Sequence, residues 1–278
     1  MKKIVAILMA AMMLLTLCAC GGSDESAAES DTFRVAMECG YAPYNWTQES
    51  DANGAAPIAD SSDYAYGYDV MMAQKIASEM GKELEIVKLD WDSLIPALQS
   101  GEVDAVIAGQ SITSERLQVV DFSEPYYYAT IVTLVKKDSP YASATSVADL
   151  AGASATSQLG TIWYDICLPQ IENADIKPAK DTAPAMLMAL DTGDVDIVVT
   201  DQPTGLAALE AYDDFVLLDF AGTNGDFEVS DEEINIGISV QKGNTELLDA
   251  INAVLATMTE DDYKAMMQEA ISVQPLSE

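Results

Sequence analysis

Short apolar segments alternate with amphipathic ones through most of the chain beyond residue 32. Residues 33–38, 84–89 and 103–108 are apolar runs of strand length, and residues 68–80 carry apolar side chains at helical spacing. Gly81 follows this helical segment and predicts its end. Strands that alternate with helices are typical of a parallel sheet with crossover connections, so the pattern predicts an α/β fold.

The rest of the chain continues this alternation. Asp92 is expected to cap a helix that runs through Leu98 to Gly101. Further strands are predicted at 129–136 and 234–240, and two terminal helices at about 245–258 and 261–271. The polar segment 47–66 is interpreted as a surface loop or an extended hairpin, and the acidic segment 224–235 as solvated, because it lacks the ligand spacing of a calcium loop.

An internal repeat links the two halves of the chain. The sequence ALQSGEVDAVIAG at 97–109 resembles ALDTGDVDIVVTD at 189–201, and both predict a helix end, a glycine and a buried strand. Gly109 and Asp201 occupy equivalent positions at the ends of these strands. Coincidence between two ordinary helix–strand turns is the alternative, but the length of the match favours two similar α/β substructures.

Two long strands divide these substructures. The strand at 129–136 leads out of the first half, and the strand at 234–240 leads back. This predicts a two-lobed α/β protein with two crossing strands, in which lobe I comprises 32–131 and 232–278 and lobe II comprises 132–231. Open α/β sheets bind ligands beyond the carboxyl ends of their strands, so we expect a ligand cleft between the lobes.

The first 31 residues have the features of an export signal. Lys2 and Lys3 precede the apolar run 4–17, which is too short to span a bilayer comfortably. The run ends in LCAC, which predicts a signal peptide at 1–19, lipidation of Cys20 and a polar tether at 20–31. Cys18 fits less well because Leu17 would precede it, and a plain signal peptide cut nearby is the alternative. The mature chain is therefore expected outside the cytoplasm, anchored to the bacterial cell membrane by its lipid.

Charge and composition exclude several functions. The chain has 46 acidic and 13 basic residues, a net charge of −33, which argues against nucleic-acid binding. It has no histidine and no phosphate-binding or catalytic motif, so we expect no enzyme activity, no metal and no cofactor. Cys39 and Cys167 fall in different predicted lobes, and we expect no bridge between them because it would obstruct lobe movement.

Several polar groups follow the strand end at Gly109. Ser111, Thr113 and Arg116 place hydroxyls, backbone amides and a guanidinium near one point, a combination that suits a carboxylate. The simpler interpretations are helix capping for Ser111 and Thr113, and for Arg116 an ion pair with Glu115 or Asp121.

The second half offers a complementary set. Asp201 could accept an ammonium group, although TDQPT is equally a good helix start with Asp201 as its cap. Thr161 in QLGTIW could cap a helix or hold an anion. Tyr41, Trp46 and Trp91 could line a pocket, although burial in the core is the more usual place for an aromatic residue. An anion site facing a cation site describes a receptor for a zwitterion such as an α-amino acid.

The segments FRVAMECGYAPYNW, GYDVMMAQKIASEMGKELEIVKLDWDSLIPALQSGEVDAVIAGQSITSER and VDFSEPYYY resemble the family 3 extracellular solute-binding proteins, the amino-acid receptors of ABC importers. The resemblance covers about 33–271 and implies the type II periplasmic-binding-protein fold. It also implies roles for nine residues. They are Arg116, Gly109, Ser111 and Thr161 for the ligand carboxylate end, Asp201 for the α-ammonium, Tyr41 and Trp91 as flanking aromatics, and Glu38 and Gln158 in the side-chain pocket.

The resemblance further implies a monomer that captures a free amino acid and delivers it to the transmembrane permease subunits of an ABC importer. The family often has Asp where this chain has Glu38, which leaves the depth of the side-chain pocket open. A glutamate among aromatics favours a cationic or amide side chain, such as that of Arg, Lys or Gln. The alternative function is an enzyme on the same fold, a cyclohexadienyl dehydratase acting on prephenate or arogenate.

Overall fold

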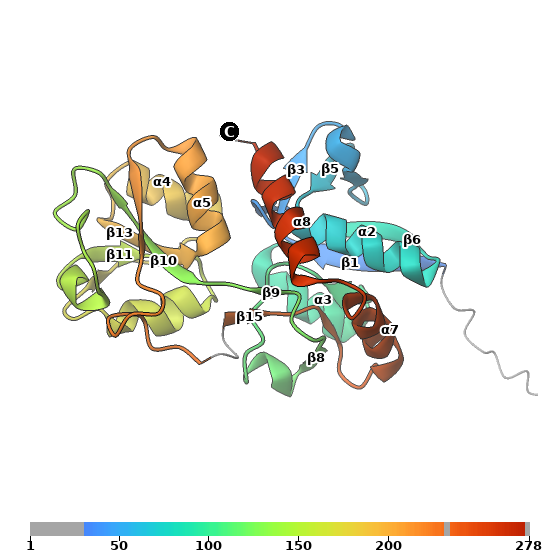
Figure 1. Cartoon of the computed structure of the whole chain (residues 1–278). Helices are drawn as coiled ribbons and strands as arrows, with labels where there is room; N and C mark the ends of the chain where they lie inside the picture. Colours follow the sequence, from blue (N-terminus) through green and yellow to red (C-terminus); the bar gives the residue numbers. More distant parts are fainter. Residues whose placement is uncertain (1–30, 231–233, 276–278) are drawn as a thin grey trace, which may run out of the picture. The chain divides into compact units, whose positions relative to one another are not determined.

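Two five-stranded sheets organise the protein (Figure 1). The computed structural model describes residues 31–230 and 234–275, and both sheets lie in one compact unit, Thr32–Glu278. The first sheet has the strand order β6-β1-β7-β16-β8, and the second has the order β12-β11-β13-β10-β14. In each sheet the first three strands run parallel and the fourth runs antiparallel to them. The predicted two-lobed α/β fold is confirmed.

The first sheet contains β1 (Thr32–Met37), β6 (Glu83–Lys88), β7 (Ala105–Val106), β8 (Val120–Phe122) and β16 (Ser239–Gln241). The second contains β10 (Ile131–Lys136), β11 (Ser154–Thr156), β12 (Asp175–Ile176), β13 (Ile197–Asp201) and β14 (Phe215–Asp219). The α-helices are α2 (Tyr68–Met80), α3 (Leu94–Ser100), α4 (Ala183–Asp191), α5 (Gln202–Ala211), α7 (Thr245–Leu255) and α8 (Glu260–Val273). Single helical turns are η1 (Ala52–Gly54), η2 (Trp91–Ser93), η3 (Arg116–Gln118), η4 (Val147–Leu150), η5 (Trp163–Cys167) and η6 (Leu168–Gln170).

The chain crosses between the two sheets twice. Short strands β9 (Tyr127–Tyr128) and β15 (Asn235–Ile236) pair antiparallel, and Figure 1 shows them between the two halves. The chain continues from β9 into β10 of the second sheet, and from β15 into β16 of the first. The fourth strand of each sheet therefore arrives from the other half of the chain, which ties the two sheets together at the crossing.

The sequence repeat has the same local structure in both halves. After α3 and α4 the chain turns at Gly101 and Gly193, each with φ of 77°. The Asp104 carboxylate then accepts the backbone N–H of Arg34 on β1 at 2.8 Å, and the Asp196 carboxylate accepts that of Ser154 on β11 at 2.9 Å. Each aspartate therefore joins the chain just before one strand to the backbone of the neighbouring strand, and it has the same structural role in both copies of the repeat.

One local prediction needs correction, and another is decided between its two alternatives. The Asp92 side chain does not cap a helix, because Asp92 lies inside the turn η2 and α3 begins at Leu94 without a side-chain cap. Segment 47–66 takes the hairpin alternative and forms part of a small antiparallel sheet. Its strands are β2 (Gly40–Tyr41), β3 (Asn45–Gln48), β4 (Ala56–Pro57) and β5 (Tyr64–Tyr66). Residues 1–19 and Cys20, most of the predicted tether and residues 231–233 lie outside the described residues.

The predicted helix at 68–80 agrees with α2 at both ends. Gly81 adopts the left-handed conformation that ends it, with φ of 68°. The apolar positions Val70, Ala73 and Ala77 are buried against the first sheet's core, as their spacing predicts. In the second sheet, all five residues of β13 are buried, since α4 and α5 both contact this strand.

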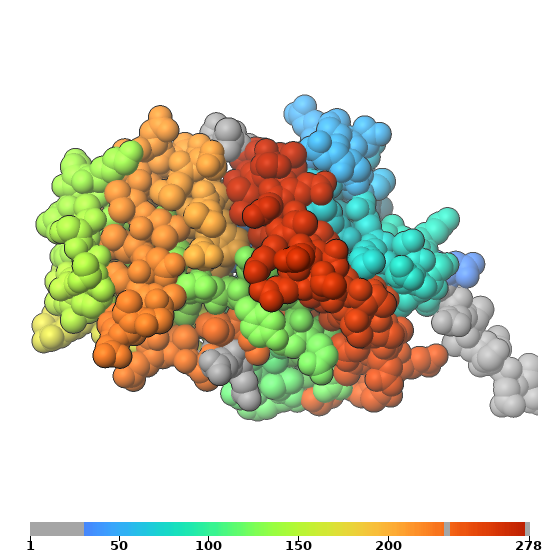
Figure 2. Space-filling model, in the orientation of Figure 1, coloured from blue at the N-terminus to red at the C-terminus, as the bar shows by residue number. Residues whose placement is uncertain are grey.

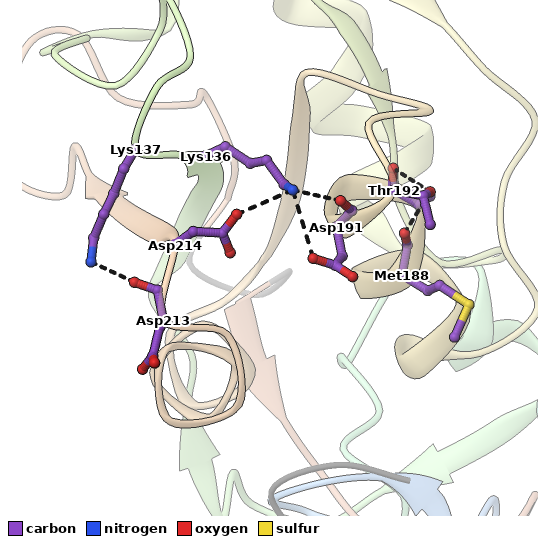
Figure 3. Close-up of polar contacts among 8 residues, drawn as sticks. Lys136, Lys137, Met188, Asp191, Thr192, Asp213 and Asp214 are labelled. Carbon is purple, nitrogen blue, oxygen red and sulfur yellow. Dashed lines mark hydrogen bonds and ion pairs between the residues drawn. The ribbon is translucent and has the colours of Figure 1, made fainter.

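The last helix, α8, contacts elements of both halves. It packs against α2 and also touches α5, and Figure 2 shows the red surface of α8 adjoining the orange surface of α5. At the outer end of the second sheet, Lys136 of β10 donates to the Asp191 carbonyl at 2.5 Å and forms an ion pair with Asp214 at 3.1 Å (Figure 3). This exposed cluster adds little stability, because such pairs contribute about 0–1 kcal/mol each.

None of the helices in residues 31–230 and 234–275 combines the length and apolar character that crossing a bilayer requires. Both cysteines in this part of the chain, Cys39 and Cys167, are buried, and no disulfide joins them to one another.

Gly205 is expected to be irreplaceable on the buried face of α5. A Cβ there would lie 2.8 Å from Val132 Cγ2 and 2.9 Å from Leu217 Cδ1. Overpacking of this kind costs about 1–3 kcal/mol, against a gain of about 1 kcal/mol in helix propensity. We expect Gly205→Ala to lower the free energy of unfolding in urea by about 1 kcal/mol, the middle of the net range. Leu206→Ala, on the exposed face of the same helix, is the control with a smaller effect; a Gly205→Ala protein as stable as wild type would contradict the close packing.

Candidate functional site

The carboxyl end of β7 forms the first wall of the site. Gly109 follows the strand with φ of 62°, and its N–H donates to the Tyr126 hydroxyl at 3.2 Å. A Cβ at this position would lie 2.8 Å from Tyr41 Cε1. Glycine is needed here for two reasons, because the backbone is left-handed and an aromatic ring lies directly against it.

Arg116 begins η3 and reaches from the first lobe to the second. Its guanidinium donates to the Ser111 carbonyl at 2.9 Å and to the Gly160 carbonyl at 3.1 Å, and it lies 5.4 Å from the centre of the Trp91 ring. The alternative ion pair with Asp121 is wrong, because Asp121 pairs with Lys242. Burial lowers the pKa of Arg116 to about 10, so it remains cationic at neutral pH.

The turn before η5 forms the opposite wall. Gly160 has φ of 66°, and a Cβ there would lie 3.1 Å from Trp91 Nε1, so the two walls approach closely. The buried Thr161 hydroxyl donates to the Gln158 carbonyl at 2.7 Å and accepts the Tyr164 N–H at 3.4 Å. The threonine therefore does cap the turn, as one of its two sequence interpretations proposed.

Asp201 ends β13 and caps α5. Its carboxylate accepts the Thr204 N–H at 2.9 Å and the Thr204 hydroxyl at 3.1 Å, and the Tyr41 hydroxyl of the first lobe donates to Oδ2. The residue is fully buried. Burial raises its pKa, although these hydrogen bonds act in the opposite direction. The capping interpretation is thus confirmed, and the capping carboxylate also accepts a hydrogen bond from Tyr41 of the other lobe.

A third contact between the lobes joins Glu38 and Gln158. The Gln158 side-chain amide donates to Glu38 Oε2 at 3.1 Å, and both residues are buried. Burial raises the pKa of Glu38 to about 7, opposed by the Gln158 hydrogen bond and reinforced by Asp90. This carboxyl lies where a cation would strengthen its ionised form.

Seven of the nine predicted residues line one narrow cavity between these walls. The lining residues are Tyr41, Trp91, Gly109, Ser111, Arg116, Gln158, Thr161 and Trp163. Asp201 is not among them, and its carboxylate instead accepts a hydrogen bond from the hydroxyl of the lining residue Tyr41. Glu38 instead lines an adjoining groove with Asp90, Asp92, Asp181 and Lys88. Trp46 packs on Tyr66, away from the cavity.

Trp163 is the lining residue that sequence reasoning missed. Its ring lies 6.4 Å from that of Tyr41, and the residue is 6% exposed. It comes two residues after Thr161 in QLGTIW, so its proximity to a candidate residue was the available signal. Among residues 31–230 and 234–275, no cluster of three or more acidic or cysteine side chains is arranged to hold a metal ion.

Comparison with known proteins agrees with this architecture. Residues 33–272 match the model of the bacterial extracellular solute-binding proteins, family 3, and the chain belongs to this family. A probable histidine-binding protein of Campylobacter jejuni is 32% identical, covering 73% of this chain and 75% of that protein. The arginine-binding extracellular protein ArtP of Bacillus subtilis is 36% identical over 58% of each chain.

Solved structures give the same result. An amino-acid ABC transporter substrate-binding protein from Streptococcus pneumoniae, bound to L-arginine, is 27% identical with a TM-score of 0.75, covering 88% of this chain and 95% of that one. The family resemblance seen in the sequence is confirmed. The chain is a solute-binding protein of this family, and the relatives named here are amino-acid-binding proteins.

The raised pKa of Glu38 predicts a pH-dependent stability. The pKa of Glu38 is about 7 in the folded state, against 4.5 ordinarily, so the folded protein holds a proton on this carboxyl at pH values where the unfolded chain has lost it. Its contribution to the free energy of unfolding is therefore complete below about pH 4.5 and is lost as the pH rises through 7. The full effect is on the order of 3 kcal/mol. We expect Glu38→Gln to flatten the decline in the free energy of unfolding between pH 5.5 and 8, measured by urea denaturation. The pKa of buried Asp69 is also raised to about 7 by burial, so part of the decline in the free energy of unfolding should remain in Glu38→Gln.

Glu85→Gln is the matched control, because Glu85 pairs with Arg34 on the surface and its side chain is 41% exposed. The control variant should keep the wild-type decline. A Glu38→Gln protein with the same pH dependence as wild type would contradict the buried, unneutralised state of this carboxyl.

Proposed function

We propose that this chain is the receptor of an amino-acid ABC importer and holds one polar L-amino acid in the cavity between its lobes. The observation that carries the proposal is the separation of opposite charges across the cavity. Arg116 lines the cavity and has carbonyl oxygens as its partners, whereas Asp201 lies behind the lining residue Tyr41 and has neutral donors as its partners. An α-amino acid presents a carboxylate and an ammonium that can reach both.

Four residues are proposed to serve the ligand carboxylate. A guanidinium can bind a carboxylate through two charge-assisted hydrogen bonds, and Arg116 is the cation that lines the cavity. The Thr161 hydroxyl can turn to donate to the same anion, and Ser111 and Gly109 complete this side of the lining. Burial of Arg116 favours the interaction, because an ion pair is stronger in a less polar environment.

Asp201 is proposed to accept the α-ammonium. The ammonium would replace the Tyr41 hydroxyl, which donates to the same oxygen in this structure. Exchanging a neutral donor for a cationic one gives a stronger hydrogen bond and also neutralises a fully buried carboxylate. Tyr41 would keep its other role as an aromatic wall, opposite Trp91.

For the ligand side chain, we propose a preference for arginine, lysine or glutamine, with L-arginine the first to test. Gln158 of the cavity lining contacts Glu38 of the adjoining groove, and that groove carries three further acids, Asp90, Asp92 and Asp181, against one cation, Lys88. A guanidinium in this groove would favour the ionised form of Glu38 and would be attracted by the excess of carboxylates around it. The named relatives include arginine-binding proteins, which supports this order of testing.

Lobe closure is the proposed mechanism of capture. The lobe boundaries proposed from the sequence, 32–131 with 232–278 and 132–231, put the contacts Glu38–Gln158, Tyr41–Asp201 and Arg116–Gly160 across the cleft. A ligand bound to both walls stabilises the closed state relative to the open one. The permease subunits of the importer are proposed to recognise that closed state in a monomeric receptor.

Membrane attachment is proposed to depend on Cys20. A cut after Ala19 would leave this cysteine as the first residue of the mature chain, followed by the small and polar residues 21–31. Such a segment suits a flexible tether between lipid and receptor. The receptor would then work at the outer face of the cell membrane, close to its permease.

Removing the charge of either Asp201 or Arg116 should strongly weaken amino-acid binding. Asp201→Asn preserves a good helix cap but removes the charge, and Arg116→Gln preserves a polar side chain but removes the cation. Losing one partner of a buried charge pair costs about 2–5 kcal/mol, so we expect binding of L-arginine in calorimetry to weaken by at least about thirtyfold. Lys264→Gln, which removes an exposed cation that pairs with Glu260 on α8, should bind as wild type does.

Thermal shifts of the wild-type protein with each of the twenty amino acids test the ligand preference, because a ligand that binds only the folded state raises the melting temperature. The function fails if no amino acid binds. The roles proposed for Asp201 and Arg116 are contradicted if Asp201→Asn and Arg116→Gln retain wild-type affinity.

Cys20→Ser should release the protein from the membrane. The variant lacks the thiol that would carry the lipid, so after expression in a bacterium we expect it in the soluble extracytoplasmic or culture fraction, while wild type stays with membranes. Mass spectrometry of the wild-type protein should give an acylated N-terminal peptide that begins at Cys20. Cys18→Ser is the matched control and should remain membrane-bound; acylation that persists in Cys20→Ser would contradict the assignment.

A further inference from the structure

We infer that Asp69 is a positioning residue for the amino-acid site, acting through Tyr126 on Gly109 and through Asn45 on the turn between Glu38 and Tyr41. The inference rests on the proposed function of that site. Asp69 is the second residue of α2 and is fully buried. Its two carboxylate oxygens each accept a side-chain hydrogen bond, one toward each part of the site.

The first branch runs through Tyr126 to the strand end. The Tyr126 hydroxyl donates to Asp69 Oδ1 at 2.6 Å and accepts the Gly109 N–H at 3.2 Å. Tyr126 is itself held by Tyr68, whose ring stacks on it at 5.7 Å and whose hydroxyl donates to the Tyr126 carbonyl at 2.6 Å. The Gly109 peptide, which lines the cavity, is therefore oriented by a chain of two hydrogen bonds that ends at Asp69.

The second branch runs through Asn45 to the turn that carries the other wall residues. The Asn45 amide donates to Asp69 Oδ2 at 2.7 Å, and its carbonyl oxygen accepts the Cys39 N–H at 2.7 Å. Cys39 has φ of 53°, which is unfavourable for a residue other than glycine, and its carbonyl also accepts the Thr47 hydroxyl at 2.8 Å. Asn45 thus helps hold a strained residue between Glu38 and Tyr41.

An ordinary structural role does not account for this arrangement. An acid in the first turn usually stabilises a helix by accepting free N–H groups or by its charge. Here the first N–H groups of α2 are already taken, since Tyr68 donates to the Pro43 carbonyl at 3.1 Å and Asp69 to the Tyr44 carbonyl at 2.8 Å. The carboxylate instead binds two side chains that both lead to the site, at the expense of burying an ionisable group.

The donor pattern provides a rescue test. Asp69→Asn replaces two acceptor oxygens by one acceptor and one donor, so either the Tyr126 hydroxyl or the Asn45 amide loses its acceptor. The double variant Asn45→Asp/Asp69→Asn restores every pair, because the acid and the amide exchange places. The new carboxylate at position 45 would accept from the Cys39 N–H and from the new amide at position 69, whose carbonyl oxygen would accept from Tyr126. Tyr126→Phe removes one branch without changing the shape of the ring.

We expect Asp69→Asn and Tyr126→Phe to weaken L-arginine binding about tenfold in calorimetry, at a temperature where each protein is folded. In the ligand-free proteins, hydrogen exchange followed by NMR should show faster exchange of the Gly109 amide. The double variant should return both readings toward wild type. Ile76→Val, two turns further along α2 and buried, controls for a loss of stability alone and should change neither reading.

The inference is overturned if Asp69→Asn and Tyr126→Phe keep the wild-type affinity and the wild-type Gly109 exchange, or if the double variant binds as weakly as Asp69→Asn. If Asp69→Asn does not fold, Tyr126→Phe tests the first branch and Asn45→Ala tests the second, and wild-type affinity in both variants overturns the inference. A wild-type protein that binds no amino acid contradicts the proposed function instead, and the exchange of the ligand-free Gly109 amide still decides the role of Asp69.

Discussion

The burial of carboxyl groups without an ion-pair partner is the constraint on which this structure depends. Asp201, Glu38 and Asp69 are all buried, and burial raises the pKa of each. In the described part of the chain, none of the three forms an ion pair with lysine or arginine. Their side-chain donors are neutral, namely Tyr41 and Thr204 for Asp201, Gln158 for Glu38, and Tyr126 and Asn45 for Asp69. Such a region is stabilised by any cation that can enter it.

The fold creates this situation by bringing strand ends from two sheets together. Gly109 and Asp201 occupy the same place in two copies of one α/β repeat, so the copies can present different chemistry at equivalent positions. The fourth strand of each sheet comes from the other half of the chain, which leaves the short pair β9 and β15 as the connection. In the proposed mechanism of capture, the two sheets would approach or separate about this crossing.

Local sequence patterns predict the fold and part of the site, and the family resemblance implies the remaining site residues. Helix 68–80, the repeat and the strand ends at Gly109 and Asp201 follow from periodicity and turn residues. Contacts between distant segments do not follow: nothing in the pattern pairs Tyr41 with Asp201, which are 160 residues apart, or directs Arg116 to the Gly160 carbonyl instead of Asp121. The Asp69 network was also hidden, because an acid in a first helical turn has an ordinary explanation.

Arg116 shows why the opposite charges of the site remain separate. Its guanidinium is bonded to carbonyl oxygens and lies over Trp91, so it is partly desolvated without being neutralised by an acid of the protein. If Arg116 and Asp201 satisfied one another, a ligand would have to break that pair before binding, and little free energy would remain for closure. Neutral partners hold each pole in place but bind it less strongly than an opposite charge does. Under the proposed function, a zwitterion would displace or supplement these partners, and its binding energy would hold the lobes together.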